Sequence, residues 1–265
     1  MNNLLANFSI LWPALIAGVL VTLSHVPLGQ QVLRRGIVFI DLAIAQVAGV
    51  GVVAAHYMGL DLQGWMTQVA AVTAALGGAL VLTWTERKRP EVQEALIGVM
   101  FVVASTVQIL LLANDPHGGE DLKDLLAGQI LWVTPAQLWR AGIVTAVFLA
   151  LWWTVAQRLG RIGFYTLFAV MVTVSVQLVG VYLVFTSLIV PAIATYRYPA
   201  GRQLWLGLVL VILSYVVGLI LSAVSDLPTS ALVVPVMVVI GTVVHLMSPR
   251  NAPNTLGATS VADPH

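Results

Sequence analysis

Apolar residues in this chain are gathered into long uninterrupted stretches. Residues 95–114, 203–225 and 227–249 carry no Asp, Glu, Lys or Arg over 20, 23 and 23 positions. A helix rises about 1.5 Å per residue, so each stretch is long enough to cross a hydrocarbon core of about 30 Å. The pattern therefore predicts helices that span a membrane.

Charged residues and helix breakers divide the chain into successive apolar segments. These segments are residues 11–33, 37–58, 65–85, 95–113, 141–156, 164–194, 204–224 and 231–246. The stretch 164–194 is too long for one crossing and short for two, and Gly180 and Pro191 interrupt it. We expect a broken or re-entrant helix pair there, because non-helical backbone is tolerated at that depth only inside protein or beside a cavity. The expected fold is an all-α, polytopic transmembrane helical bundle of eight or nine spans.

Two polar stretches lie outside these segments. Residues 114–124 are expected to form the longest loop, in which His117, Glu120 and Asp121 could hold a cation loosely or dock another protein. A solvated acidic loop is the simplest interpretation of that stretch. Residues 250–265 are rich in Pro, Thr and Asn, which is typical of a disordered tail. Residues 1–249 are then one transmembrane domain.

The composition excludes most other classes of protein. Charged residues make up 9% of the chain, against about 25% in a soluble domain. A soluble enzyme and a nucleic-acid-binding protein are both disfavoured by this composition. The chain has no Cys, no G-x-x-x-x-G-K-[ST] loop, no H-E-x-x-H and no G-x-S-x-G. The sequence thus predicts neither an enzyme nor an ATP site on this chain.

The basic residues predict an orientation in the membrane. Ten of the 12 Lys and Arg residues fall on one side of the predicted topology, and only Lys123 and Arg140 fall on the other. Cytoplasmic loops of membrane proteins carry the excess of Lys and Arg. We therefore expect a multi-pass protein of the cell (inner) membrane, with the N-terminus outside and the tail 250–265 in the cytoplasm.

Three polar residues are expected within the first two spans. Asp41 is the only carboxylate deep in a span, about 10 Å from the inner surface if the chain there is helical. By the same rise, His25 lies about 13 Å deep and Gln46 about 18 Å deep. If they meet between the two helices, these groups suit a divalent cation such as Zn²⁺ or Mn²⁺. The alternative is that Asp41 accepts hydrogen bonds from neighbouring helices and His25 is a neutral packed ring.

Other polar residues in the spans have simpler interpretations. Gln108 and Gln177 are expected to be hydrogen-bond partners between helices.

Three stretches of the sequence resemble a known family. They are LGQQVLRRGIVFIDLAIAQVAGVGVV at 28–53, LVGVYLVFTSLIVPAIATYRY at 178–198 and SYVVGLILSAVSDLPTSALVV at 214–234. The chain is similar, over about residues 14–247, to the permease subunit of ABC importers for zinc, manganese or iron(II). That class is related more distantly to permeases for vitamin B12 and siderophores.

The resemblance implies the function and the partners. It implies a membrane permease, most simply a homodimer, that moves a divalent metal inward with a cytoplasmic ATPase and an extracytoplasmic solute-binding protein. No covalently bound cofactor and no nucleic acid are implied. The family's metal motif is Asp-x-x-x-His, and in this chain the residue four positions after Asp41 is Ala45. The metal itself is therefore left open among Zn, Mn and Fe.

The resemblance also places a contact with the ATPase near residues 191–202. We expect Pro191 to end the preceding helix and a short amphipathic helix to follow, with Tyr196, Arg197 and Arg202 facing acidic groups on the ATPase. A plain basic inner loop is the alternative.

Two other functions remain open. The first is a stand-alone secondary transporter of a small cation, and the second is a membrane-anchored assembly subunit without a transport path. A neighbouring gene for a P-loop ATPase would favour the importer over both.

Overall fold

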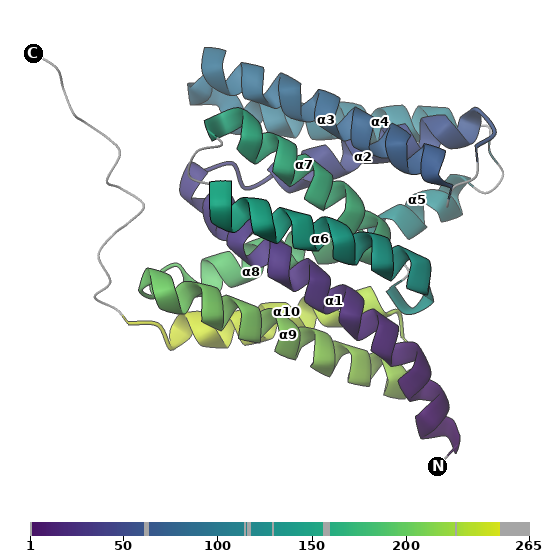
Figure 1. Ribbon diagram of the computed structural model, residues 1–265, viewed down its shortest axis with the longest axis vertical. Helices are drawn as coiled ribbons and strands as arrows, with labels where there is room; N and C mark the ends of the chain where they lie inside the picture. The colour runs from purple at the N-terminus through teal and green to yellow at the C-terminus, as the bar shows by residue number, and fades with distance from the viewer. Residues whose placement is uncertain are drawn as a thin grey trace, which may run out of the picture.

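The computed structural model describes residues 2–60, 64–113, 115, 118–128, 130–155, 160–225 and 227–249. All regular structure in these ranges is helical, which confirms the predicted all-α bundle (Figure 1). The α-helices are α1 (Asn2–Arg35), α2 (Ile40–Tyr57), α3 (Trp65–Lys88), α4 (Gln93–Leu112), α5 (Gly118–Ala127), α6 (Pro135–Val155), α7 (Gly160–Val179), α8 (Val181–Thr195), α9 (Ala200–Ser225) and α10 (Thr229–Leu246). Two 3-10 turns, η1 (Pro90–Val92) and η2 (Ile130–Trp132), lie between them.

Eight of the described helices are long and apolar enough to cross a membrane. They are α1, α2, α3, α4, α6, α7, α9 and α10, and each coincides with one of the apolar segments of the sequence or, for α7, with the first part of one. The remaining apolar helix, α8, has 15 residues. Eight spans and one short helix agree with the predicted count of eight or nine.

The predicted break within residues 164–194 falls at a single residue. Gly180 separates α7 from α8 and has a φ of 83°. A Cβ at this position would meet the backbone of Ala127 and Gly128, and Gly128 itself has a φ of 71°. Glycine is needed at both positions, because only glycine combines positive φ with such close backbone approach.

The prediction that Pro191 ends a helix is wrong. Pro191 is buried inside α8, which continues to Thr195. Proline removes one backbone hydrogen bond, but neighbouring helices and hydroxyl side chains compensate for this in membrane helices.

The expected long loop at residues 114–124 is also wrong in part. Helix α5 covers Gly118–Ala127, and it packs on α4 and α8. Leucines at 122, 125 and 126 recur with helical spacing in an otherwise polar stretch, which favours an amphipathic helix. Leu126 packs against the hydrophobic core. The charges of this stretch predict a loop, but the helical spacing of its leucines outweighs them.

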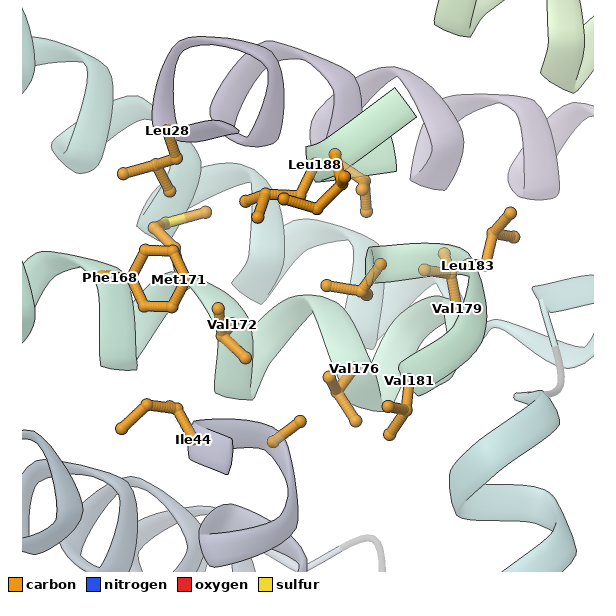
Figure 2. Close-up of a cluster of buried hydrophobic side chains, with 14 of the residues drawn as sticks. Leu28, Ile44, Phe168, Met171, Val172, Val176, Val179, Val181, Leu183 and Leu188 are labelled. Atoms are coloured by element: carbon orange, nitrogen blue, oxygen red, sulfur yellow. The ribbon is translucent and has the colours of Figure 1, made fainter. Parts of the chain in front are cut away.

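Helix α7 lies at the centre of the described bundle. It packs on α2 and α3 on one side and on α1, α6 and α8 on another. Figure 2 shows Leu28 of α1 and Leu188 of α8 on one side of α7, and Ile44 of α2 on the opposite side. Helices α1 and α2 are joined by a short turn, yet α7 packs on both of them and lies between Leu28 of α1 and Ile44 of α2.

Candidate functional site

Asp41 is a fully buried carboxylate at the start of α2. It lies in the first helical turn with 0% of its surface exposed, and neither side-chain oxygen has a hydrogen-bond partner among the described residues. The free N–H groups of a first helical turn favour a negative charge. An ionised carboxylate buried without a partner is otherwise costly. Asp41 is therefore suited to bind a cation within an apolar environment.

His25 is a second buried group with an unused atom. Its Nδ1 lies 3.1 Å from the Val21 carbonyl oxygen and 2.9 Å from the Ser24 hydroxyl, while Nε2 is buried without a partner among the described residues. A carbonyl oxygen only accepts, so the neutral ring carries its proton on Nδ1. The lone pair of Nε2 is then available, which is the arrangement of a metal-binding imidazole held by a backbone carbonyl.

Gln46 is occupied by another helix. The amide nitrogen of Gln108 on α4 donates to the Gln46 side-chain oxygen at 2.7 Å and to its backbone oxygen at 2.9 Å. Both residues are buried. The prediction that Gln108 joins two helices is confirmed. The side-chain nitrogen of Gln177, by contrast, is buried without a partner among the described residues.

The structure does not bring Asp41, Gln46 and His25 together as a triad. Gln46 bonds to α4, His25 bonds within α1, and α7 lies between α1 and α2. Among the described residues no three His, Asp or Glu side chains are grouped as a metal site. The expected meeting between the first two helices is therefore wrong, because helices that follow one another in the chain are separated here by a later one.

Sequence reasoning missed a polar contact on the α1 side of α7. The Tyr215 hydroxyl of α9 lies 3.2 Å from the Ser187 hydroxyl of α8, and both residues are buried. The Tyr215 ring also packs against Gly18 of α1. A single tyrosine within the long apolar stretch 203–225 was the available signal.

The turn between α8 and α9 differs from the expected short helix. Residues 196–199 form a turn, and α9 begins at Ala200. The side-chain nitrogen of Gln203 donates to the carbonyl oxygens of Tyr196 (3.1 Å) and Tyr198 (2.7 Å). Carbonyl oxygens at the end of a helix have no partner within the helix, and Gln203 supplies one here. No separate amphipathic helix forms in this described stretch. Gln203 was not singled out by the sequence analysis.

This turn is also tied to α1 and α10. Arg34 at the end of α1 donates to the Gln203 oxygen at 3.2 Å. The Tyr198 hydroxyl donates to the Val244 carbonyl at 3.2 Å, and the Tyr196 ring stacks on His245 with centroids 5.7 Å apart. Three helices therefore hold the turn in place.

The predicted coupling residues around this turn differ in exposure. Pro191 is buried, while Tyr196 and Arg197 are partly exposed and Arg202 is exposed. The Nε of Arg197 donates to the Tyr196 hydroxyl at 2.9 Å, which holds the guanidinium beside that ring. Arg197 and Arg202 present positive charge at the end of the bundle where α8 ends and α9 begins.

The predicted acidic residues of the opposite end are only partly described. Glu120 is exposed on α5. Asp121 is in the same helix, but its side chain lies outside the described residues, as does His117. Nearby, His56 Nε2 at the end of α2 lies 3.6 Å from an Asp115 carboxylate oxygen.

Comparison with known proteins identifies the family. The family model of the ABC 3 transport family matches residues 7–164 and 153–248. The chain belongs to the ABC 3 transport family. The predicted resemblance to metal-uptake ABC permeases is thereby confirmed.

Curated relatives of this ABC 3 chain extend over most of its length. It is 25% identical to the manganese transport system membrane protein MntC of Halalkalibacterium halodurans, over 93% of this chain and 90% of the relative. It is 24% identical to the high-affinity zinc uptake system membrane protein ZnuB of Haemophilus influenzae, over 83% and 90%.

Solved structures share the fold. A chain of PsaBC from Streptococcus pneumoniae in complex with Fab superposes with a TM-score of 0.75 at 20% identity, over 91% of this chain and 92% of that one. An inward-facing putative metal-chelate type ABC transporter gives a TM-score of 0.67 at 16% identity, over 88% and 84%.

Proposed function

We propose that this chain is the membrane-spanning permease subunit of an ABC importer and that it moves a divalent metal ion inward. The observation that carries the proposal is a buried, unpaired carboxylate, Asp41, in a spanning helix of an ABC 3 family member. Relatives named for manganese and for zinc transport support a metal as the substrate.

The chemistry of the two unpaired groups supports a borderline divalent cation. A carboxylate and a neutral imidazole suit Zn²⁺, Mn²⁺ and Fe²⁺ better than they suit a soft monovalent ion. Because α7 separates α1 from α2, Asp41 and the Nε2 of His25 act at different points rather than in one coordination shell. Gln46 holds α2 to α4 and gives no free ligand.

Energy for transport comes from a partner in this proposal. The sequence has no P-loop, so ATP binds a separate cytoplasmic ATPase, and an extracytoplasmic binding protein delivers the metal. A second copy of the permease completes the complex. The turn at 196–199, held by three helices, transmits the motion of the ATPase through Arg197 and Arg202 to α8.

The test is metal uptake by cells that carry a charge-neutral variant at position 41. Asp41→Asn keeps the size of the side chain and removes its charge, so ATP-dependent accumulation of zinc, manganese or iron should fall by roughly tenfold or more, which corresponds to about 1.4 kcal/mol or more. Element analysis of whole cells measures the accumulation.

The matched control is Glu91→Gln, which removes one exposed carboxylate paired to Arg89 at 3.8 Å. It should leave uptake unchanged. Normal uptake by an Asp41→Asn protein that reaches the membrane in normal amount would refute the role of Asp41. Uptake by the chain alone, without an ATPase, would instead favour a secondary transporter.

A further inference from the structure

A groove runs along α7 between α3 and α6. Both of those helices pack on α7, whereas they have little contact with each other, and Figure 1 shows the three side by side. The groove has a volume of about 530 Å³. Neither Asp41 nor any residue of the turn at 196–199 lines this groove, so it is separate from both.

The lining of the groove changes from polar to apolar with depth. Gln68, Arg140 and Gln177 lie near the helix ends that are opposite the basic turns. Val170 lies nine positions before the end of α7, roughly 14 Å deeper by the helical rise, among further aliphatic side chains. This gradient matches a molecule with a polar head and an apolar chain.

The polar end of the groove has unused donors. Arg140 is exposed, and its Nε donates to the Ala136 carbonyl oxygen at 3.3 Å. Among the described residues Arg140 has no ion pair, and no carboxylate lines the groove. The side-chain nitrogen of Gln177, which also lines the groove, is buried without a partner among the described residues. An anion is the complement of one guanidinium and one amide donor.

Arg140 is also unusual in its position. In the topology predicted from the sequence, only Arg140 and Lys123 lie on their side of the membrane, opposite the other ten basic residues. Trp65, 65% exposed, borders the groove at the same level, as tryptophan does at a membrane–water interface.

We propose that this groove binds one phospholipid with an anionic headgroup, from the leaflet opposite the basic turns. The phosphate accepts hydrogen bonds from Arg140 and Gln177, and one acyl chain lies along Val170 and Val174. The lipid fills the space between α3 and α6, and it joins these two helices across α7.

The test compares lipids added to the full chain in a neutral detergent. Phosphatidylglycerol should raise the Tm by roughly 2–4 °C, because a ligand that binds only the folded state stabilises it. Phosphatidylcholine should raise the Tm less, and soluble glycerol 3-phosphate should have no effect because it lacks the acyl chain. An equal shift with all three would overturn the proposal.

Two variants remove the same charge at different places. Arg140→Gln should lose most of the shift caused by phosphatidylglycerol. Lys123→Gln is the matched control, since Lys123 is the other basic residue at this end, is exposed on α5 and does not line the groove. Equal shifts in the two variants would show general attraction of anionic lipid and would refute this site.

A second pair of variants tests the apolar part. Val174→Trp places a large ring in the groove and should abolish the shift, whereas Val209→Trp on α9, at a position that is 55% exposed, should retain it. A full shift in a folded Val174→Trp protein would mean that another surface binds the lipid.

Discussion

Some buried polar side chains of this protein have hydrogen-bond partners, and others have none among the described residues. The Gln108 amide nitrogen donates twice to Gln46, so this pair is satisfied and joins α4 to α2. Asp41 and the Nε2 of His25 have no partner among the described residues. A satisfied pair in a membrane protein supports the fold, whereas a buried unpaired ionisable group indicates function.

Gln108→Leu should destabilise the protein by about 1 kcal/mol, because it leaves the Gln46 side chain buried without its donor. Thermal unfolding of the purified chain in detergent measures the change. The double variant Gln46→Leu, Gln108→Leu should cost less than the sum of the two single variants, since both polar partners are then removed. Simple additivity would show that the two side chains do not depend on each other.

At the scale of elements, the break between α7 and α8 depends on two glycines. Gly180 and Gly128 both have positive φ, and their backbones pack directly against each other. The contact connects the end of α5 to the point where α8 begins. Helix α8 then leads to the turn at 196–199, so the break and the proposed coupling region are two ends of one short helix.

Gly180→Ala should destabilise the protein by about 2 kcal/mol or more, because its backbone conformation is nearly exclusive to glycine and the new Cβ meets Gly128. Gly142→Ala is the control, since no atom within 4 Å would meet a Cβ there. It should be neutral or slightly stabilising. Thermal unfolding compares the two, and a Gly180→Ala protein as stable as Gly142→Ala would contradict the packing at the break.

The turn at 196–199 provides a second prediction at this scale. Reversing both charges, with Arg197→Glu and Arg202→Glu, should release the ATPase or separate ATP hydrolysis from metal uptake. Co-purification and uptake measured on the same membranes report these two outcomes. Arg87→Glu with Arg89→Glu is the matched control, because both residues are exposed on another basic turn. A coupled, ATPase-bound complex with the 197 and 202 reversals would refute the role of the turn.

At the scale of the whole molecule, the described basic turns share one end. Figure 1 shows the α1–α2, α3–α4 and α8–α9 connections at the left of the bundle. Contacts agree with this view: Arg35 lies over the Phe164 ring at 4.2 Å, and Arg161 lies 3.8 Å from Glu86. This common end is the one that we propose to be cytoplasmic.

The proposed orientation predicts which end is reached from outside the cell. The natural chain has no Cys, so a single introduced thiol gives an unambiguous signal. A membrane-impermeant reagent on intact cells should label Glu120→Cys and leave Lys88→Cys unlabelled. Both positions are exposed, so a difference reports the side of the membrane. The reverse pattern of labelling would invert the topology.

The hydrophobic pattern by itself determined the class of fold, a count of eight or nine spans and a broken helix within residues 164–194, because backbone groups in lipid must be satisfied within helices. Only the structure decided that the break falls at Gly180 and not at Pro191. The pattern also indicated Asp41, since one carboxylate in a long apolar stretch is visible without a structure. The end of α8 beyond Pro191 and helix α5 were not predicted, because packing against neighbouring helices outweighed local charge and helix-breaking preference. Only the tertiary structure showed that α7 separates α1 from α2, so His25 and Asp41 are not in one cluster. Which helices become neighbours depends on contacts between segments that are distant in the sequence. The pattern of apolar residues along the chain is nearly the same for many different packings of the helices, so it does not distinguish between them.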